Sequence, residues 1–186
     1  MTILFSSSSI EPVSIPIERR TKTFERLLSA PVSLHAIVVG ESLSGFLYSI
    51  GIALVPLVVG IVAFGNAISS PIVLTVGMLL SALCFSTMGT LFAAYPTESP
   101  GDIMSMLNLV RLPLIFVSGT FIPLDAMPTV GKAIAYFSPL TYGNDLIQYA
   151  YGNPASFNPL VDVAMLVGFF ILFQIIAHRL YAHFNE

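Results

Sequence analysis

Long apolar runs alternate with short polar breaks along most of the chain. Four of these runs carry few charges and are close to the roughly 20 residues that a helix needs to cross the hydrocarbon core of a bilayer. They cover residues 43–64, 71–95, 103–122 and 160–178. The pattern predicts four transmembrane helices.

The breaks between the runs differ in kind. AFGNAISSP is a short turn that makes a helical hairpin of the first two runs, and YPTESPGD separates the second run from the third. Residues 123–159 are too polar to span a membrane and too apolar for a free linker. Apolar residues recur there near helical spacing over 126–137 and 139–151, which predicts two short re-entrant helices in the outer leaflet.

The segment before the first run divides at Thr23. Residues 1–22, MTILFSSSSIEPVSIPIERRTK, are rich in Ser and Pro and predict a disordered or irregular cytosolic lead, so the membrane domain is expected over 23–186. The next stretch, TFERLLSAPVS, predicts a short interfacial helix that Thr23 caps and Pro31 ends.

Composition agrees with a membrane protein. Of 186 residues, 55% are hydrophobic and 9% are charged, against about 25% charged in soluble domains. The net charge of −3 and the scattered basic residues do not suggest a nucleic-acid partner. Basic residues precede the first run and follow the last, which places both termini in the cytosol of a multi-pass plasma-membrane protein. The expected fold is all-α and polytopic: four transmembrane helices, a cytosolic interfacial helix and short outer re-entrant helices.

Two features inside the runs bear on packing or transport. Ala82, Ser86 and Thr90 form a small-residue face that lets another helix approach, and four helices alone would leave this face seeking a partner. A substrate-lining role is the alternative. Arg111 is costly within a bilayer, and two interpretations stay open. It snorkels to the cytosolic surface towards Glu98 or Asp102, or it acts in a transport path or its gating.

Motifs of catalysis are missing from the sequence. It contains no HExxH, no GxSxG and no GxxxxGK[ST], and His178 and His183 lack the spacing of a helical metal pair. We therefore expect no enzyme, no catalytic residue and no metal or other cofactor on this chain. Nucleotide chemistry would belong to a partner.

Two stretches carry a family resemblance. FERLLSAPVS, residues 24–33, resembles the cytosolic segment after the second helix in permease subunits of type-2 ATP-binding-cassette (ABC) exporters. FVSGTFIPLDAMPTVGKAIAYFSPLTYGNDLIQYA, residues 116–150, is similar to the outer region of the same family. The resemblance covers roughly residues 20–184. Such permeases have six helices, and the two that precede the ERLLSAPVS segment are replaced here by the Ser/Pro lead.

The resemblance implies a transmembrane permease subunit, or part of one, of an ATP-driven exporter. Its substrate would be hydrophobic or amphiphilic, drug-like or lipid-like, and would leave the cell. Expected partners are a cytosolic ABC ATPase that binds ATP and Mg²⁺, a second permease subunit, and a separate chain supplying the two missing helices. The alternatives are a degenerate or split fragment acting only as a structural or regulatory membrane partner, or a subunit of a glycan exporter.

The resemblance also suggests site residues. Those expected to couple the chain to the ATPase subunit are Phe24, Glu25, Arg26, Leu27, Leu28, Pro31, Glu98 and Asp102. Those expected in a translocation path or its gating are Arg111, Phe116, Ser118, Phe121 and Tyr142.

Overall fold

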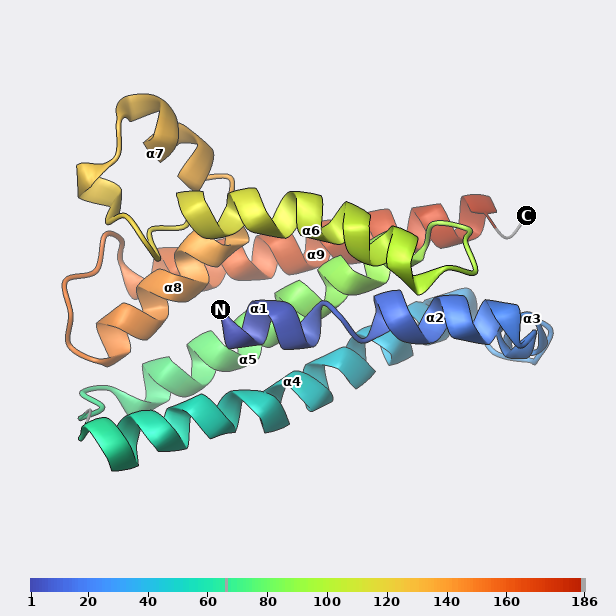
Figure 1. The fold of residues 1–186 in the computed structure, drawn as a ribbon, viewed down its shortest axis with the longest axis horizontal. Helices are drawn as coiled ribbons and strands as arrows, with labels where there is room; N and C mark the ends of the chain where they lie inside the picture. Colours follow the sequence, from blue (N-terminus) through green and yellow to red (C-terminus); the bar gives the residue numbers. More distant parts are fainter. Residues whose placement is uncertain (66, 185–186) are drawn as a thin grey trace.

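Four long apolar helices form the body of the molecule (Figure 1). The computed structural model describes residues 1–65 and 67–184, which contain no β-strand. The long helices are α4 (Leu34–Phe64), α5 (Pro71–Ala93), α6 (Pro100–Val117) and α9 (Pro159–Phe184). Each is long and apolar enough to cross a membrane, so the prediction of an all-α protein with four such helices is confirmed.

The helix ends differ from the predicted spans. α4 begins at Leu34 rather than at residue 43, because Ser33 caps it by accepting a hydrogen bond from the Ala36 amide at 3.2 Å. α6 ends at Val117 rather than at residue 122, since Gly119 has a φ of 78° that a helix cannot accommodate. The hydrophobic runs therefore located the helices, and local capping and turn geometry set their ends.

α5 is the central helix of the bundle. In the apolar 18-residue stretch of each long helix, 56% of the α5 residues are buried, against 11% in α4, 22% in α6 and 17% in α9. The outer helices instead expose large apolar side chains, including Leu47, Val62 and Leu109, at 62%, 79% and 77%. Such surfaces suit a lipid environment, where apolar exposure carries no cost.

The N-terminal segment is helical, so the expectation of an irregular lead over residues 1–22 is wrong. α1 (Thr2–Ser7) and α2 (Glu11–Arg20) pack against α4, α5 and α6, and fully bury Leu4 and Ile15. Serine hydroxyls in α1 bond to carbonyls one turn earlier, as Ser6 does to Thr2 at 2.8 Å. Burial against the small residues of α5 therefore outweighs the weak helix propensity of Ser and Pro.

The first residue lies part-way along the bundle (Figure 1). Met1 lines a cavity with Ala53 and Pro56 of α4 and Leu74 of α5. The chain then runs along α1 and α2 to the end of the bundle where α9 also finishes.

Short helices occupy the two ends of the bundle (Figure 1). α3 (Thr23–Leu28) lies at the end where α9 finishes, and α7 (Thr129–Ala135) and α8 (Pro139–Ala150) lie at the opposite end with the 3₁₀ turn Leu124–Ala126. All three predicted short helices are present. Thr23, however, is not the cap of α3: Lys22 precedes the helix with a φ of 59°, and no side chain caps it.

Candidate functional site

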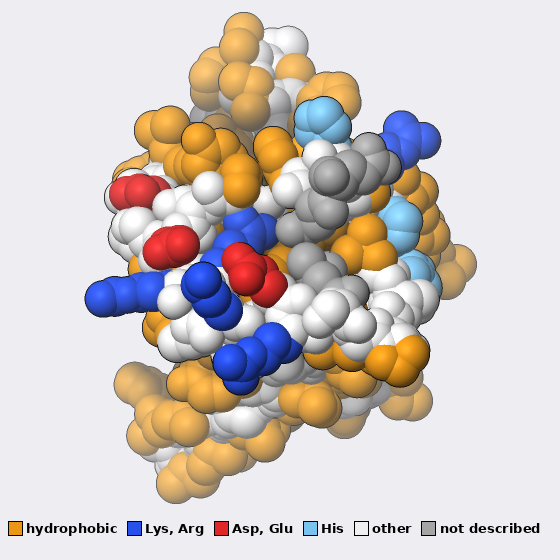
Figure 2. Space-filling view, turned by 90° about the vertical axis from the view of Figure 1, so that its right-hand side faces the viewer, with side chains coloured by type: hydrophobic (Ala, Val, Ile, Leu, Met, Phe, Trp, Pro, Cys, Tyr) orange, Lys and Arg blue, Asp and Glu red, His pale blue; other side chains and the backbone are white. Residues whose placement is uncertain are grey.

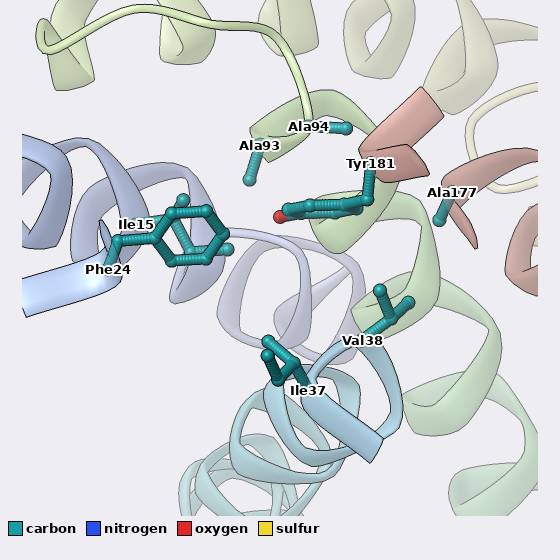
Figure 3. Close-up of a cluster of buried hydrophobic side chains, with 8 residues drawn as sticks. All are labelled: Ile15, Phe24, Ile37, Val38, Ala93, Ala94, Ala177 and Tyr181. Carbon is teal, nitrogen blue, oxygen red and sulfur yellow. The ribbon is translucent and has the colours of Figure 1, made fainter. Parts of the chain in front are cut away.

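α3 is anchored to the bundle through one buried aromatic ring. Phe24 is 1% exposed and belongs to a cluster with Ile15 of α2, Ala93 of α5 and Tyr181 of α9 (Figure 3). The Phe24 and Tyr181 ring centroids are 6.1 Å apart. A buried Phe contributes several kcal/mol, roughly 3–5 by truncation to Ala, so this contact fixes α3 against three other helices.

Arg19 reinforces the same junction from α2. Its guanidinium donates hydrogen bonds to the carbonyl oxygens of Tyr95 at 2.8 Å and Ala94 at 3.2 Å, and it lies 5.2 Å from the centre of the Phe24 ring. Carbonyls at the end of a helix lack intrahelical partners, so Arg19 satisfies those at the end of α5. Burial lowers the pKa of Arg19 from its usual range. α2, α3 and α5 are thus joined by one side chain.

The opposite face of α3 is open. Glu25, Arg26 and Pro31 are exposed, and the structure shows no ion pair for either charge among the described residues. Leu27 packs against the Phe24 cluster. The side chain of Leu28 lies outside the described part of the structure. α3 therefore presents two free charges from a backbone that is held in place.

The remaining predicted coupling residues lie at the same end of the bundle. Glu98 lies in the connection between α5 and α6, and Asp102 lies in the first turn of α6. Both are exposed, and Asp102 accepts a hydrogen bond from Thr97 at 3.3 Å. Figure 2 looks onto this end and shows acidic and basic side chains gathered on it, framed by hydrophobic side chains. The structure therefore brings the predicted coupling residues to one charged end of the bundle.

Arg111 does not snorkel towards Glu98 or Asp102. It is 1% exposed and turns to the N-terminal helices, where it donates to Ser8 at 3.0 and 2.7 Å and to Ser9 at 3.0 Å. Its guanidinium also lies 5.4 Å from the centre of the Phe5 ring. Because the N-terminal segment is folded into the bundle, the arginine finds partners there and need not reach the surface.

A glutamate is buried close to this arginine cluster. Glu11, the first residue of α2, is 0% exposed, and Ser86 of α5 donates to its Oε1 at 2.9 Å. Its Oε2 has no hydrogen-bond partner among the described residues. A Cβ on Gly89 would lie 2.7 Å from Oε2, so this glycine makes the space that the carboxyl group occupies.

The small-residue face of α5 is already covered. Ala82, Ser86 and Thr90 are at most 1% exposed, and Thr90 shares a hydrogen bond of 3.0 Å with Ser42 of α4. The prediction of close helix packing is confirmed, whereas the expectation that this face stays open for a partner is wrong. α1 and α2 together with α4 fill it.

The predicted path residues do not form one site. Phe116 and Phe121 are 59% and 64% exposed and stack with ring centroids 5.7 Å apart. Tyr142 is buried and donates its hydroxyl to the Tyr136 carbonyl at 2.7 Å, which holds α8 to α7. Arg111 contacts the N-terminal helices, and Ser118 faces the opposite end of the molecule.

Ser118 lines a polar cavity at the α8 end of the bundle. The cavity has a volume of about 350 Å³, and its polar lining residues are Ser118, Thr141, Asn144, Asp145, Gln148, Asn153 and Ser156. Asp145 fixes the loop after α8 by accepting hydrogen bonds from the Ser156 amide at 2.8 Å and the Phe157 amide at 2.9 Å. The cavity wall is therefore a structured one, and it can present amide and hydroxyl groups to a polar ligand.

Sequence reasoning missed the buried N-terminal polar residues. Ser8 and Glu11 lie in a segment expected to be irregular, although Leu4 and Ile15 flank them with apolar positions. The small-residue face on α5 was the available signal, because such a face needs a helix against it.

Comparison with known proteins identifies the family. The model of the ABC-2 type transporter family matches residues 1–151, which include both α3 and the buried α1 and α2. The chain belongs to the ABC-2 type transporter family. No solved structure matches significantly.

Several curated proteins are similar over most of the chain. The inner membrane transport permease YadH of Escherichia coli K12 is 22% identical, over 86% of this chain and 62% of its own length. Nodulation protein J of Rhizobium leguminosarum bv. trifolii is 28% identical, over 83% and 57%. The putative transport permease ycf38 of Porphyra purpurea is 24% identical, over 80% and 52%. This chain therefore spans less than two thirds of each of these relatives.

Proposed function

We propose that the chain is a transmembrane permease subunit, or part of one, of an ATP-driven ABC exporter in the plasma membrane. A cytosolic ABC ATPase would dock at the α3 end and supply the energy of ATP hydrolysis, with ATP and Mg²⁺ bound on that partner. A second permease subunit would complete the passage. Family membership and the names of its relatives as transport permeases support this assignment.

The observation that carries the proposal is the two-sided character of α3. Phe24 is buried among three helices, whereas Glu25 and Arg26 on the same short helix are exposed. A partner that pushes on the exposed face would move the buried ring and, through it, α2, α5 and α9. Because packed side chains transmit displacement whereas a loose loop absorbs it, this geometry suits energy transfer from a nucleotide-driven subunit.

The test is a double substitution on the exposed face. Glu25→Ala with Arg26→Ala should leave expression and membrane insertion intact, because exposed charges contribute little to stability. Co-purification of the cognate ATPase, and the stimulation of its ATP hydrolysis by the permease, should both fall, since charges at the rim of an interface tune docking. Lys132→Ala, at the opposite end, is the control. Wild-type ATPase recovery and stimulation in the double variant would contradict the proposal.

The substrate we propose is amphiphilic. Two exposed aromatic rings, Phe116 and Phe121, lie on either side in sequence of Ser118 and Gly119, which line the polar cavity. An apolar surface next to a polar cavity suits a molecule with an apolar body and a polar head. Transport assays with the assembled exporter test this: Asn144→Leu should reduce uptake of amphiphiles into inverted vesicles, and equal uptake by wild type and variant would contradict it.

A further inference from the structure

A groove between α4 and α9 lies outside the surfaces discussed so far. Its wider part has a volume of about 280 Å³ and is lined by Val39, Leu43, Leu83 and Phe170, together with His35, Ser42 and Gln174. An adjoining cavity of about 250 Å³ shares His35 and Gln174 and adds Ile175, His178 and Arg179. The two cavities form one groove, apolar along its length and basic at one end.

The basic end brings together side chains from two helices. His35 lies in the first turn of α4 and His178 lies near the end of α9, and their ring centroids are 5.8 Å apart. Arg179 follows directly and is exposed. Figure 2, which looks onto this end of the bundle, shows histidine side chains with a basic side chain beside them towards one edge. Among the described residues, no acidic side chain lines either cavity.

Gln174 adds an unused hydrogen-bond donor where the two cavities meet. Its Oε1 accepts a bond from Ser42 at 3.4 Å, which orients the amide. Its Nε2 is buried and has no hydrogen-bond partner within the described part of the chain. An unsatisfied buried donor costs about 1–3 kcal/mol, so a ligand oxygen placed there would be favourable.

The dimensions of the groove decide what can occupy it. Its lining runs from residue 35 to 43 on α4 and from 170 to 179 on α9, about 12 and about 14 Å at 1.5 Å per residue. A groove of this length with apolar walls and a basic end suits a hydrocarbon chain with an anionic head.

We propose that this groove binds one anionic phospholipid. The acyl chain lies along Val39, Leu43, Leu83 and Phe170, and the phosphate lies between His35, His178 and Arg179. Gln174 Nε2 donates to a phosphate or ester oxygen. Basic pockets between transmembrane helices are suited to lipid head groups, and the head would lie at the level of the end of the bundle that also carries α3. This proposal does not depend on transport.

Lipid retention measured by native mass spectrometry tests it. The full chain is reconstituted with equal amounts of phosphatidylglycerol and phosphatidylcholine of the same acyl composition, and the lipids retained per polypeptide after release are counted. Wild type should retain one phosphatidylglycerol in preference to phosphatidylcholine. Arg179→Gln should reduce this preference about fivefold, the equivalent of roughly 1 kcal/mol for one basic residue near a lipid surface. Arg20→Gln, an arginine at the same end but outside the groove, should leave it unchanged.

Two further experiments test whether the apolar part of the groove holds the acyl chain, and whether the groove binds the lipid rather than free phosphate. Val39→Phe fills the groove and should abolish retention of both lipids, whereas Met106→Phe on the exposed face of α6 should not. Millimolar inorganic phosphate should not displace the retained phosphatidylglycerol. Equal retention of the two lipids by wild type, equal losses in Arg179→Gln and Arg20→Gln, or displacement by phosphate would each overturn the proposal.

Discussion

Glutamate and arginine occur in this protein in two opposite settings. Glu11 and Arg111 are buried in the bundle, where serine side chains from neighbouring helices bind them. Glu25 and Arg26 lie exposed on α3 at the end of the bundle. A buried polar group is costly to disturb, because any partner left unsatisfied has no water to replace it, whereas an exposed charge is almost free to change. The comparison separates residues that hold the fold from residues that are available to a partner.

Adding a large side chain beside the buried polar residues of α1, α2 and α5 should have the largest effect on stability. A Cβ on Gly45 of α4 would lie 2.6 Å from the Ser86 hydroxyl and 2.8 Å from the Ser7 carbonyl oxygen. Gly45→Leu should therefore displace α1 and α2 and destabilise the protein by about 3 kcal/mol, the upper end for overpacking. Thermal aggregation followed by size-exclusion chromatography in detergent measures this loss.

The control is on the same helix. A Cβ added to Gly51 would meet no neighbouring atom of the described residues within 4 Å, so Gly51→Leu should behave like wild type. Equal stability of the Gly45 and Gly51 variants would show that the N-terminal helices do not pack as described.

Replacing the buried Arg111 by lysine should have the next largest effect on stability. Arg111→Lys keeps the charge but loses the planar fork that reaches Ser8 and Ser9 together. We expect a loss of about 2 kcal/mol, typical of hydrogen bonds to a charged group. The same thermal assay measures it, with Arg20→Lys as the exposed control. An unchanged Arg111→Lys variant would instead fit an arginine that only reaches for the surface.

Replacing Arg19, which joins α2, α3 and α5, should have a smaller effect on stability. Arg19→Gln removes the hydrogen bonds to the Ala94 and Tyr95 carbonyls and leaves Phe24 packed on Tyr181. We expect a loss of about 1 kcal/mol and faster amide hydrogen exchange at the end of α5 and in α3. Hydrogen exchange with mass spectrometry resolves these segments, and unchanged exchange in both would refute the link that Arg19 makes.

Part of this architecture could be predicted because one physical constraint dominates it. The bilayer demands long apolar helices, so α4, α5, α6 and α9 were visible as hydrophobic runs. α3 could be predicted too, because Pro31 marks its C-terminal limit and its charged residues contrast with the apolar run that follows. Apolar spacing likewise located α7 and α8.

The rest depended on contacts between segments far apart in the chain. α1 and α2 were missed because Ser and Pro disfavour helices locally, and burial against α4, α5 and α6 stabilises them. The partners of Arg111 were missed for the same reason: Ser8 is 103 residues away in sequence. The contact of Tyr142 with the Tyr136 carbonyl was missed as well, because it leaves no trace in the hydrophobic pattern.

The central claim, that the exposed face of α3 contacts an ATPase, is tested most directly by site-specific crosslinking. Cys84 is buried, so a cysteine introduced at Arg26 would be the reactive thiol of the described chain. With the cognate ATPase bound in membranes, Arg26→Cys should crosslink to that subunit through a short thiol-to-amine reagent. Val130→Cys, exposed on α7 at the opposite end, should not. No crosslink from Arg26→Cys, or equal crosslinking from both positions, would contradict the account.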